Sequence, residues 1–97
     1  RYDPILLKAF ISLIGIYPPG TLVLLDTMEM AVVVAASSDH VARPRARLVT
    51  DPMGNRIHGA LVNLSERDAA GVHVRTVIKV LDPERYRVDV GRYFLPS

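Results

Sequence analysis

Residues 21–36, TLVLLDTMEMAVVVAA, decide the fold class of this chain. Two runs of apolar, β-favouring residues flank a short polar segment, which is the pattern of two strands joined by a tight turn. We therefore predict strands over residues 21–25 and 30–36, with a turn over residues 26–29.

Three further strands are predicted from the same kind of pattern. They should cover about residues 43–50, 57–64 and 72–80, with turn chemistry over residues 51–55. The last of them alternates between apolar and polar residues, so one set of side chains should face the core. That set is Val72, Val74, Ile78 and Val80. Five short strands with tight connections predict a mostly β fold, a small five-stranded antiparallel barrel or sandwich.

Residues 3–15 have the signals of one helix that precedes the strands. Asp3 can cap its start, Pro4 suits the first helical position, and Gly15 is typical of a helix end. Between them only Lys8 and Ser12 are polar, so the helix is apolar on nearly every side. Such a helix needs protein on two sides, and a small β domain supplies one.

This helix suggests how the chain is organised. We expect residues 1–16 to be the terminal helix of an upstream domain, and residues 17–97 to be a small β-barrel accessory domain at the C-terminal end of a larger protein. Without the upstream domain, the uncovered helix should form a symmetric homodimer. The expected interface side chains are Leu7, Phe10, Ile11 and Ile14.

Composition limits the class of protein. A chain of 97 residues with 49% apolar content suits one globular domain with a single core. It has no cysteine, so we expect no disulfide framework and a reducing, cytoplasmic setting. No apolar run reaches the roughly 18 residues of a membrane-spanning helix, so no membrane partner is expected.

Residues that could carry out chemistry are few. The histidines His40, His58 and His73 lack the spacing of metal ligands. Ser65 lies beside charged residues, but turn chemistry explains that cluster better than nucleophilic catalysis does. We expect no catalytic residue, no metal site and no cofactor, so the chain should not be an enzyme by itself.

One set of side chains could bind an anion. Arg43, Arg45 and Arg47 alternate, so on a strand their guanidinium groups would project from one face and suit phosphate. Alternatively they keep an exposed β face solvated, or join Arg75 and Lys79 in a broad basic surface for RNA or protein. Aromatic residues for stacking bases are lacking nearby, so nucleic acid is not a favoured partner.

Two segments resemble the C-terminal part of bacterial HD-GYP-type phosphohydrolases. Residues 2–11, YDPILLKAFI, resemble the start of the last helix of the catalytic bundle, and residues 15–23, GIYPPGTLV, resemble the passage into a small β domain. Residues 80–83 and 93–95 are also similar to that extension. The family carries out metal-dependent hydrolysis of cyclic di-GMP or related cyclic dinucleotides. Its His-Asp pair, further histidines and Gly-Tyr-Pro belong to the bundle, and no residue of this chain matches them.

The resemblance therefore implies a non-catalytic accessory or regulatory module of a cyclic dinucleotide phosphodiesterase, in signal transduction, with the upstream catalytic helical bundle as its partner. A second resemblance is to cyclic di-GMP receptors of the PilZ type, which are β-barrels. Arg43 and Arg47 fit their R-x-x-x-R segment, and residues 63–68, NLSERD, fit their (D/N)-x-S-x-x-G segment except that Asp68 replaces the glycine. This alternative implies a barrel that binds an anionic nucleotide.

Overall fold

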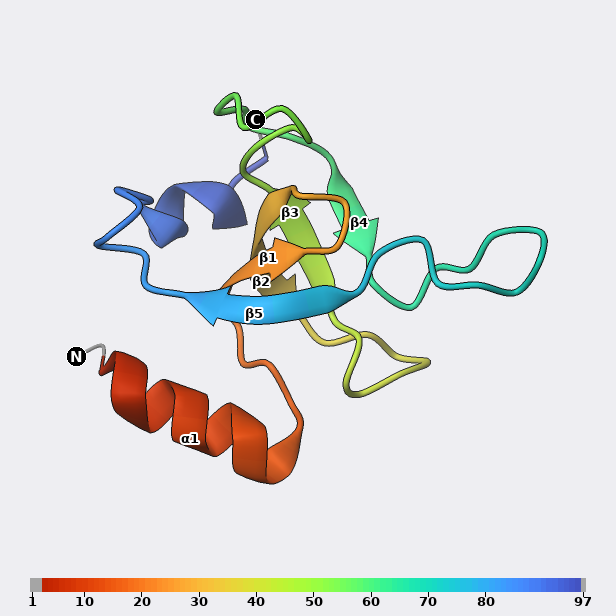
Figure 1. Cartoon of the computed structure of the whole chain (residues 1–97), viewed down its shortest axis with the longest axis horizontal. Helices are drawn as coiled ribbons and strands as arrows, with labels where there is room; N and C mark the ends of the chain where they lie inside the picture. Colours follow the sequence, from red (N-terminus) through yellow and green to blue (C-terminus); the bar gives the residue numbers. More distant parts are fainter. Residues whose placement is uncertain (1–2, 97) are drawn as a thin grey trace.

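The computed structural model describes residues 3–96, without the side chains of Pro4, Leu7 and Ser12, and it is mostly β (Figure 1). One helix precedes five strands and a final short 3-10 helix. These elements are α1 (Pro4–Ile14), β1 (Leu22–Leu25), β2 (Met30–Ala35), β3 (Arg45–Leu48), β4 (Leu61–Asn63), β5 (Val77–Leu81) and η1 (Val90–Phe94). The predicted class, with five antiparallel strands after one N-terminal helix, is confirmed.

The strands form one antiparallel sheet in the order β4-β3-β2-β1-β5. In its centre Val23 of β1 lies opposite Ala31 of β2 and Val80 of β5. Among residues 3–96, β4 and β5 remain the two edges of the sheet, so it does not close into a barrel. Its architecture is nevertheless barrel-like, because side chains from both edges pack on one shared cluster.

Alternation divides the central strands between two apolar clusters. The first cluster contains the buried side chains of Val23, Leu25, Ala31, Val33, Ala46, Leu48 and Leu64. Val62 from one edge strand and Val77 from the other pack against it. The second cluster contains Leu22, Val32, Val49, Leu81, Val88 and Tyr93. Because Tyr93 belongs to η1, this short helix covers the second face of the sheet.

The two predicted turns in this part of the chain are confirmed. In the first, the amide of Met28, at a left-handed φ of 72°, donates to the carbonyl of Leu25 at 2.9 Å. In the second, the carboxylate of Asp51 accepts from the amides of Met53 and Asn55, each at 2.9 Å. These are the local side chain–backbone bonds that favour aspartate in turns.

The predicted alternation over residues 72–80 is wrong for part of that segment. Residues 72–76 lie outside β5, and Ile78 is 53% exposed, whereas Val77 and Val80 pack on the first cluster. The reason is a β-bulge, because Leu24 pairs with Lys79 while Leu25 pairs with Val77. Ile78 is the extra residue, and it reverses the side-chain alternation beyond it.

The strand predicted over residues 57–64 is also shorter, because β4 covers only Leu61–Asn63. Gly59 lies so close to β3 that an added Cβ would be 2.8 Å from the Cβ of Leu48. Its amide donates to the carbonyl of Leu48 at 2.9 Å. The backbone at Gly59 therefore approaches the end of β3 closely, and regular pairing of β3 with β4 begins only at Leu61.

Candidate functional site

The three arginines predicted to share one face do not do so. Arg45 and Arg47 lie on β3, on the opposite side from Ala46 and Leu48 of the first cluster. Arg43 precedes the strand, beyond Pro44, and its side chain lies beside Leu64 and Val77, which belong to the first cluster or pack on it. The prediction of a single arginine face is therefore wrong, because the strand begins two residues later than expected.

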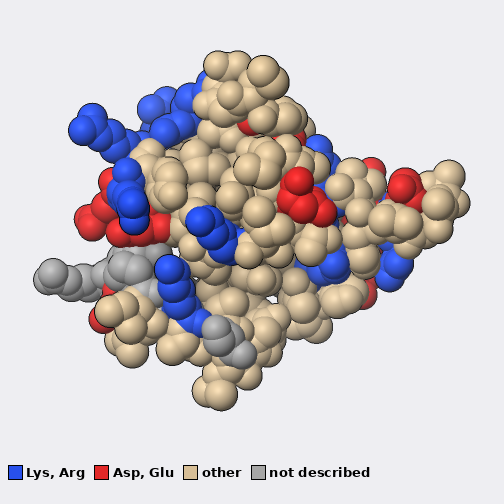
Figure 2. Space-filling model, in the orientation of Figure 1, with Lys and Arg blue, Asp and Glu red and all other residues tan. Residues whose placement is uncertain are grey.

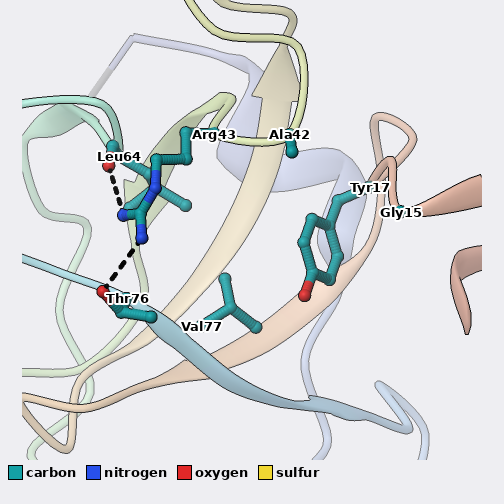
Figure 3. A pocket seen from close by; sticks show the side chains of 7 residues that line it. All are labelled: Gly15, Tyr17, Ala42, Arg43, Leu64, Thr76 and Val77. Atoms are coloured by element: carbon teal, nitrogen blue, oxygen red, sulfur yellow. Dashed lines mark hydrogen bonds between the residues drawn. The ribbon is translucent and has the colours of Figure 1, made fainter.

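Arg43 joins the two ends of the sheet that lie farthest apart in strand order. Its Nη1 donates to the carbonyl oxygens of Leu64 and Arg75, each at 3.1 Å, and its Nη2 donates to Oγ1 of Thr76 at 3.4 Å. Leu64 follows β4 and Thr76 precedes β5. Figure 3 shows the guanidinium group held between them. This half-buried cation is a structural clamp between the sheet edges.

A pocket of about 210 Å³ lies next to this clamp, where the segment that follows α1 meets the sheet. Tyr17 and Val77 form one wall and Arg43 lies across from them (Figure 3). A phosphate here would meet one half-buried arginine that already donates to three oxygens, and no other charged residue lines the described pocket. We therefore do not assign an anion site to this pocket.

Arg47 is also engaged within the chain. Its Nε donates to the carbonyl of Tyr93 at 3.1 Å, and its Nη1 donates to the carbonyl of Gly59 at 3.1 Å. The first bond fastens η1 to β3 at the second cluster, and the second bond holds the segment before β4. Of the three predicted arginines, Arg45 is the one that is exposed to solvent.

Arg75 forms an ion pair in place of the predicted basic surface. Its Nε lies 2.8 Å from Oε1 of Glu29, whose side chain is only 7% exposed. Burial opposes ionisation of Glu29, but the hydrogen bonds from Arg75 and Thr27 and the charge of Arg75 together lower its pKa. Arg43, Arg47 and Arg75 are thus all held by partners in the chain, and of the predicted broad surface Arg45 and Lys79 are exposed.

The segment compared with PilZ receptors stabilises its own turn. The hydroxyl of Ser65 lies 2.7 Å from Oδ1 of Asn63 and 3.1 Å from Oδ2 of Asp39, and the amide of Ser65 donates to Oδ1 of Asn63 at 3.0 Å. The hydrogen bond from Ser37 is the largest cause of a lowered pKa for Asp39. These hydrogen bonds within the chain explain the polar residues Asn63 and Ser65, so no bound ligand is needed to explain them.

The three histidines do not come together as a set of metal ligands in the described part of the chain. His40 and His73 meet edge to face at 6.4 Å between ring centroids, while His58 stacks on Tyr93 at 5.2 Å. Burial, followed by the charges of Arg43 and Arg67, lowers the pKa of His73. Within residues 3–96, the structure gathers no group of three or more histidine or acidic side chains that could hold a metal ion.

Helix α1 has the capping that the sequence predicts. The carboxylate of Asp3 accepts from the amides of Ile5 and Leu6 at 3.0 and 3.3 Å. Gly15 ends the helix at a left-handed φ of 76°, and its amide donates to the carbonyl of Ile11. The helix is therefore bounded by its own sequence at both ends. It is too short to cross a bilayer, and no other helix among the described residues could do so.

Most of the described apolar side chains of α1 have no cover. Ile5 is 80% exposed and Leu13 87% exposed, and the predicted interface residues Phe10 and Ile14 are about half exposed. The predicted interface residue Ile11 differs, because it is buried beside Tyr17 and Val80 of its own chain. The side chain of Leu7 lies outside the described part. Figure 1 shows α1 lying beside β5, apart from the rest of the sheet.

A second group of basic side chains, which the sequence did not single out, lies around η1. Its members are Arg56, Arg87 and Arg92. They are separated by up to 36 positions and form no recognisable motif, so only the fold brings them together.

Comparison of the chain with protein-family models, with curated proteins and with solved structures finds no match.

Proposed function

We propose that this chain is a non-catalytic accessory module of a bacterial, cytoplasmic HD-GYP-type cyclic dinucleotide phosphodiesterase, and that α1 docks it onto the catalytic helical bundle. The observation that supports this function is the exposed apolar surface of a well-capped helix. The resemblance of residues 2–23 to HD-GYP-type phosphohydrolases is the reason for proposing the catalytic bundle of that family as the partner.

The energetics favour a large apolar occupant for α1. Each large apolar side chain left in water forgoes roughly 1.5–3 kcal/mol relative to burial. Ile5, Leu6 and Leu13 are each more than two-thirds exposed, so covering these three alone is a substantial driving force. A patch of this kind is typical of an interaction surface.

A helical bundle fits the shape of this surface better than a flat partner does. Ile11 already seats one side of α1 against Tyr17 and Val80, while Ile5 and Leu13 point away from that contact. Two neighbouring helices can cover the remaining sides through ridge-and-groove packing. The β module would then remain outside the bundle, where it can transmit a regulatory contact.

The reaction itself belongs to the proposed bundle. In the family that the chain resembles, the metal ligands lie in that bundle, and the described residues here gather no ligand group. Arg43 and Arg47, which an anionic nucleotide receptor would need together, do not converge on one site, because Arg43 bonds Leu64 of the first cluster and Arg47 bonds Tyr93 of the second. The accessory role therefore accounts for more of the arrangement than the receptor alternative does.

The sequence encoded upstream of Arg1 tests the identity of the bundle. A His-Asp pair and a Gly-Tyr-Pro in a helical segment are expected there, and their absence would refute the proposed family. In the longer protein, backbone amides of residues 8–14 should exchange with deuterium more slowly than in the 97-residue chain. Leu13→Glu should remove that protection, whereas Met53→Glu, at another exposed apolar position, should leave it unchanged.

A further inference from the structure

A basic pocket lies on the side of the molecule where the turn over residues 83–87 meets η1. Its volume is about 270 Å³, and its walls include Arg56, Arg87, Arg92, His58 and Asp89. Three arginines and one aspartate thus line the same pocket. In Figure 2, Lys and Arg side chains gather over this part of the molecule, and acidic side chains border them below. We refer to this site as the Arg56 pocket.

Arg56 is held in place at the pocket by the chain itself. Its Nη2 donates to the carbonyl of Tyr86 at 2.8 Å, and its Nη1 donates to the carbonyl of Arg87 at 3.1 Å. A guanidinium group has five N–H donors, so these two bonds fix its plane and leave further donors for a ligand. A fixed arginine loses less conformational freedom on binding than a mobile one.

Arg87 occupies a backbone position that favours glycine. Its amide donates to the carbonyl of Glu84 at 3.2 Å, and the amide of Val88 donates to the carbonyl of Pro83 at 2.9 Å. This bond pair is the Schellman motif, whose left-handed residue is usually glycine. Arg87 holds that position at a φ of 55°, although a side chain there is strained. Strained residues of this kind cluster at functional sites.

One wall of the pocket is aromatic. His58 stacks on Tyr93 with an angle of 14° between the rings, and its Nε2 lies 2.9 Å from the carbonyl oxygen of Leu95. Tyr93 is buried, and its carbonyl accepts from Arg47. The hydrogen bond from Arg47 of β3 and the stacking of His58 on Tyr93 therefore both hold this wall of the pocket in place.

We propose that the Arg56 pocket binds the phosphate group of a small anion, either inorganic phosphate or a phosphate monoester. Planar guanidinium groups recognise phosphate oxygens in bidentate geometry, and Arg56, Arg87 and Arg92 reach the pocket from three separate segments. The ligand should be compact, because the volume suits one phosphate with a small organic group. A long polyanion such as RNA would extend beyond the pocket and meet Glu84 in the adjoining turn. Nothing in this site depends on the docking of α1.

Calorimetry of the 97-residue chain with inorganic phosphate and with adenosine monophosphate tests the proposal. Saturable binding of at least one of them is expected, and it should weaken at least about tenfold in Arg87→Gly and in Arg92→Ala. Arg56→Ala is less informative, because it also removes the bonds to Tyr86 and Arg87. Asp89→Asn should strengthen binding, since it removes the one carboxylate in the pocket.

Arg45→Ala is the matched control, because Arg45 is an exposed arginine outside the pocket. It should leave the affinity unchanged. Tighter binding of the nucleotide than of phosphate, lost in His58→Ala, would assign the organic group to the stacked wall, whereas equal binding would assign free phosphate. Absence of saturable binding of both up to about 10 mM, or equal affinities for Arg87→Gly, Arg92→Ala and wild type, would overturn the proposal.

Discussion

The Nε atom of Arg75 donates to Oε1 of Glu29 at 2.8 Å, and this bond ties the entrance of β5 to the turn between β1 and β2. Glu29 is buried at 6% exposure, so its carboxylate depends on Arg75 in place of water. The amide of Asp26 also donates to the carbonyl of Thr76 at 2.9 Å beside this pair. The Arg75–Glu29 ion pair therefore helps to position β5, an edge strand whose side-chain alternation is interrupted by a bulge.

The stability of the chain should depend on the ionisation of Glu29. Its pKa lies below the ordinary value of 4.5, so the folded state binds this proton less readily than the unfolded state does. The contribution of the carboxylate is therefore present above about pH 4.5 and lost as the pH falls through the folded pKa. In urea unfolding, Glu29→Gln should be less stable than wild type by roughly 1–2 kcal/mol at pH 7, and the difference should shrink at about pH 3. Glu66→Gln, at an exposed position, should show no such difference, and a pH-independent gap for Glu29→Gln would contradict the assignment.

Arg43 should contribute to folding more than to ligand binding. Arg43→Ala removes the donor to three oxygens at the two sheet edges and should lower the free energy of unfolding by about 2–4 kcal/mol. Arg45→Ala, two residues away and exposed, should change it by less than about 0.5 kcal/mol. Chemical denaturation followed by circular dichroism measures both variants. Equal, small effects would show that the clamp does not stabilise the sheet.

The isolated chain should associate through α1. The exposed Ile5 and Leu13 have no cover in one copy, so we expect a symmetric dimer in which two α1 helices cover each other. Sedimentation velocity should show a dimer for wild type and a monomer for Ile5→Glu/Leu13→Glu, with the β circular dichroism signal unchanged. Met53→Glu, also at an exposed apolar side chain, should stay dimeric. A wild-type monomer at high concentration, with α1 ordered, would contradict this prediction.

The 97-residue chain should not hydrolyse cyclic di-GMP. The reason is that the histidines of this chain lie on separate segments and the described residues gather no metal-ligand group. Incubation with manganese or iron(II), followed by dialysis and metal analysis, should leave no stoichiometric metal and give no turnover. Retained metal together with product would reveal a site that neither the sequence pattern nor the arrangement of residues 3–96 indicates.

The sequence predicted those parts of the fold that local chemistry determines. Asp3 and Gly15 specify the ends of α1, and Asp51 specifies its turn, because each acts on backbone groups within four residues. The bulge at Ile78 could not be predicted in this way, because it arises from the pairing of β5 with β1. Propensity describes a strand by itself, whereas register depends on its neighbour.

The same distinction explains the outcome for the arginines. Alternation placed Arg43, Arg45 and Arg47 together, but Arg43 donates to the carbonyl groups of Leu64, after β4, and Arg75, before β5. Both acceptors lie far from Arg43 in sequence. Conversely, Arg56, Arg87 and Arg92 show no pattern in sequence and meet only through packing of η1 on the sheet. Charged side chains with several donors are therefore the residues whose roles a sequence pattern predicts least well.

The backbone strain at Arg87 gives a prediction that separates stability from binding. Arg87 has a φ of 55° in a Schellman turn, where glycine carries no steric penalty. Arg87→Gly should therefore raise the free energy of unfolding by about 0.5–1 kcal/mol in buffer without phosphate, because the relieved strain exceeds the entropy that glycine adds to the unfolded chain. Arg87→Ala is the matched control, since it removes the guanidinium group but keeps a Cβ at the left-handed position. The bonds from Arg56 to the carbonyls of Tyr86 and Arg87 remain in both variants, so the turn itself should persist.

In urea unfolding, Arg87→Gly should have the highest free energy of unfolding, and wild type and Arg87→Ala should have similar, lower values. If the glycine variant is no more stable than the alanine variant, the left-handed turn is not strained, and strain gives no support to a binding role for Arg87.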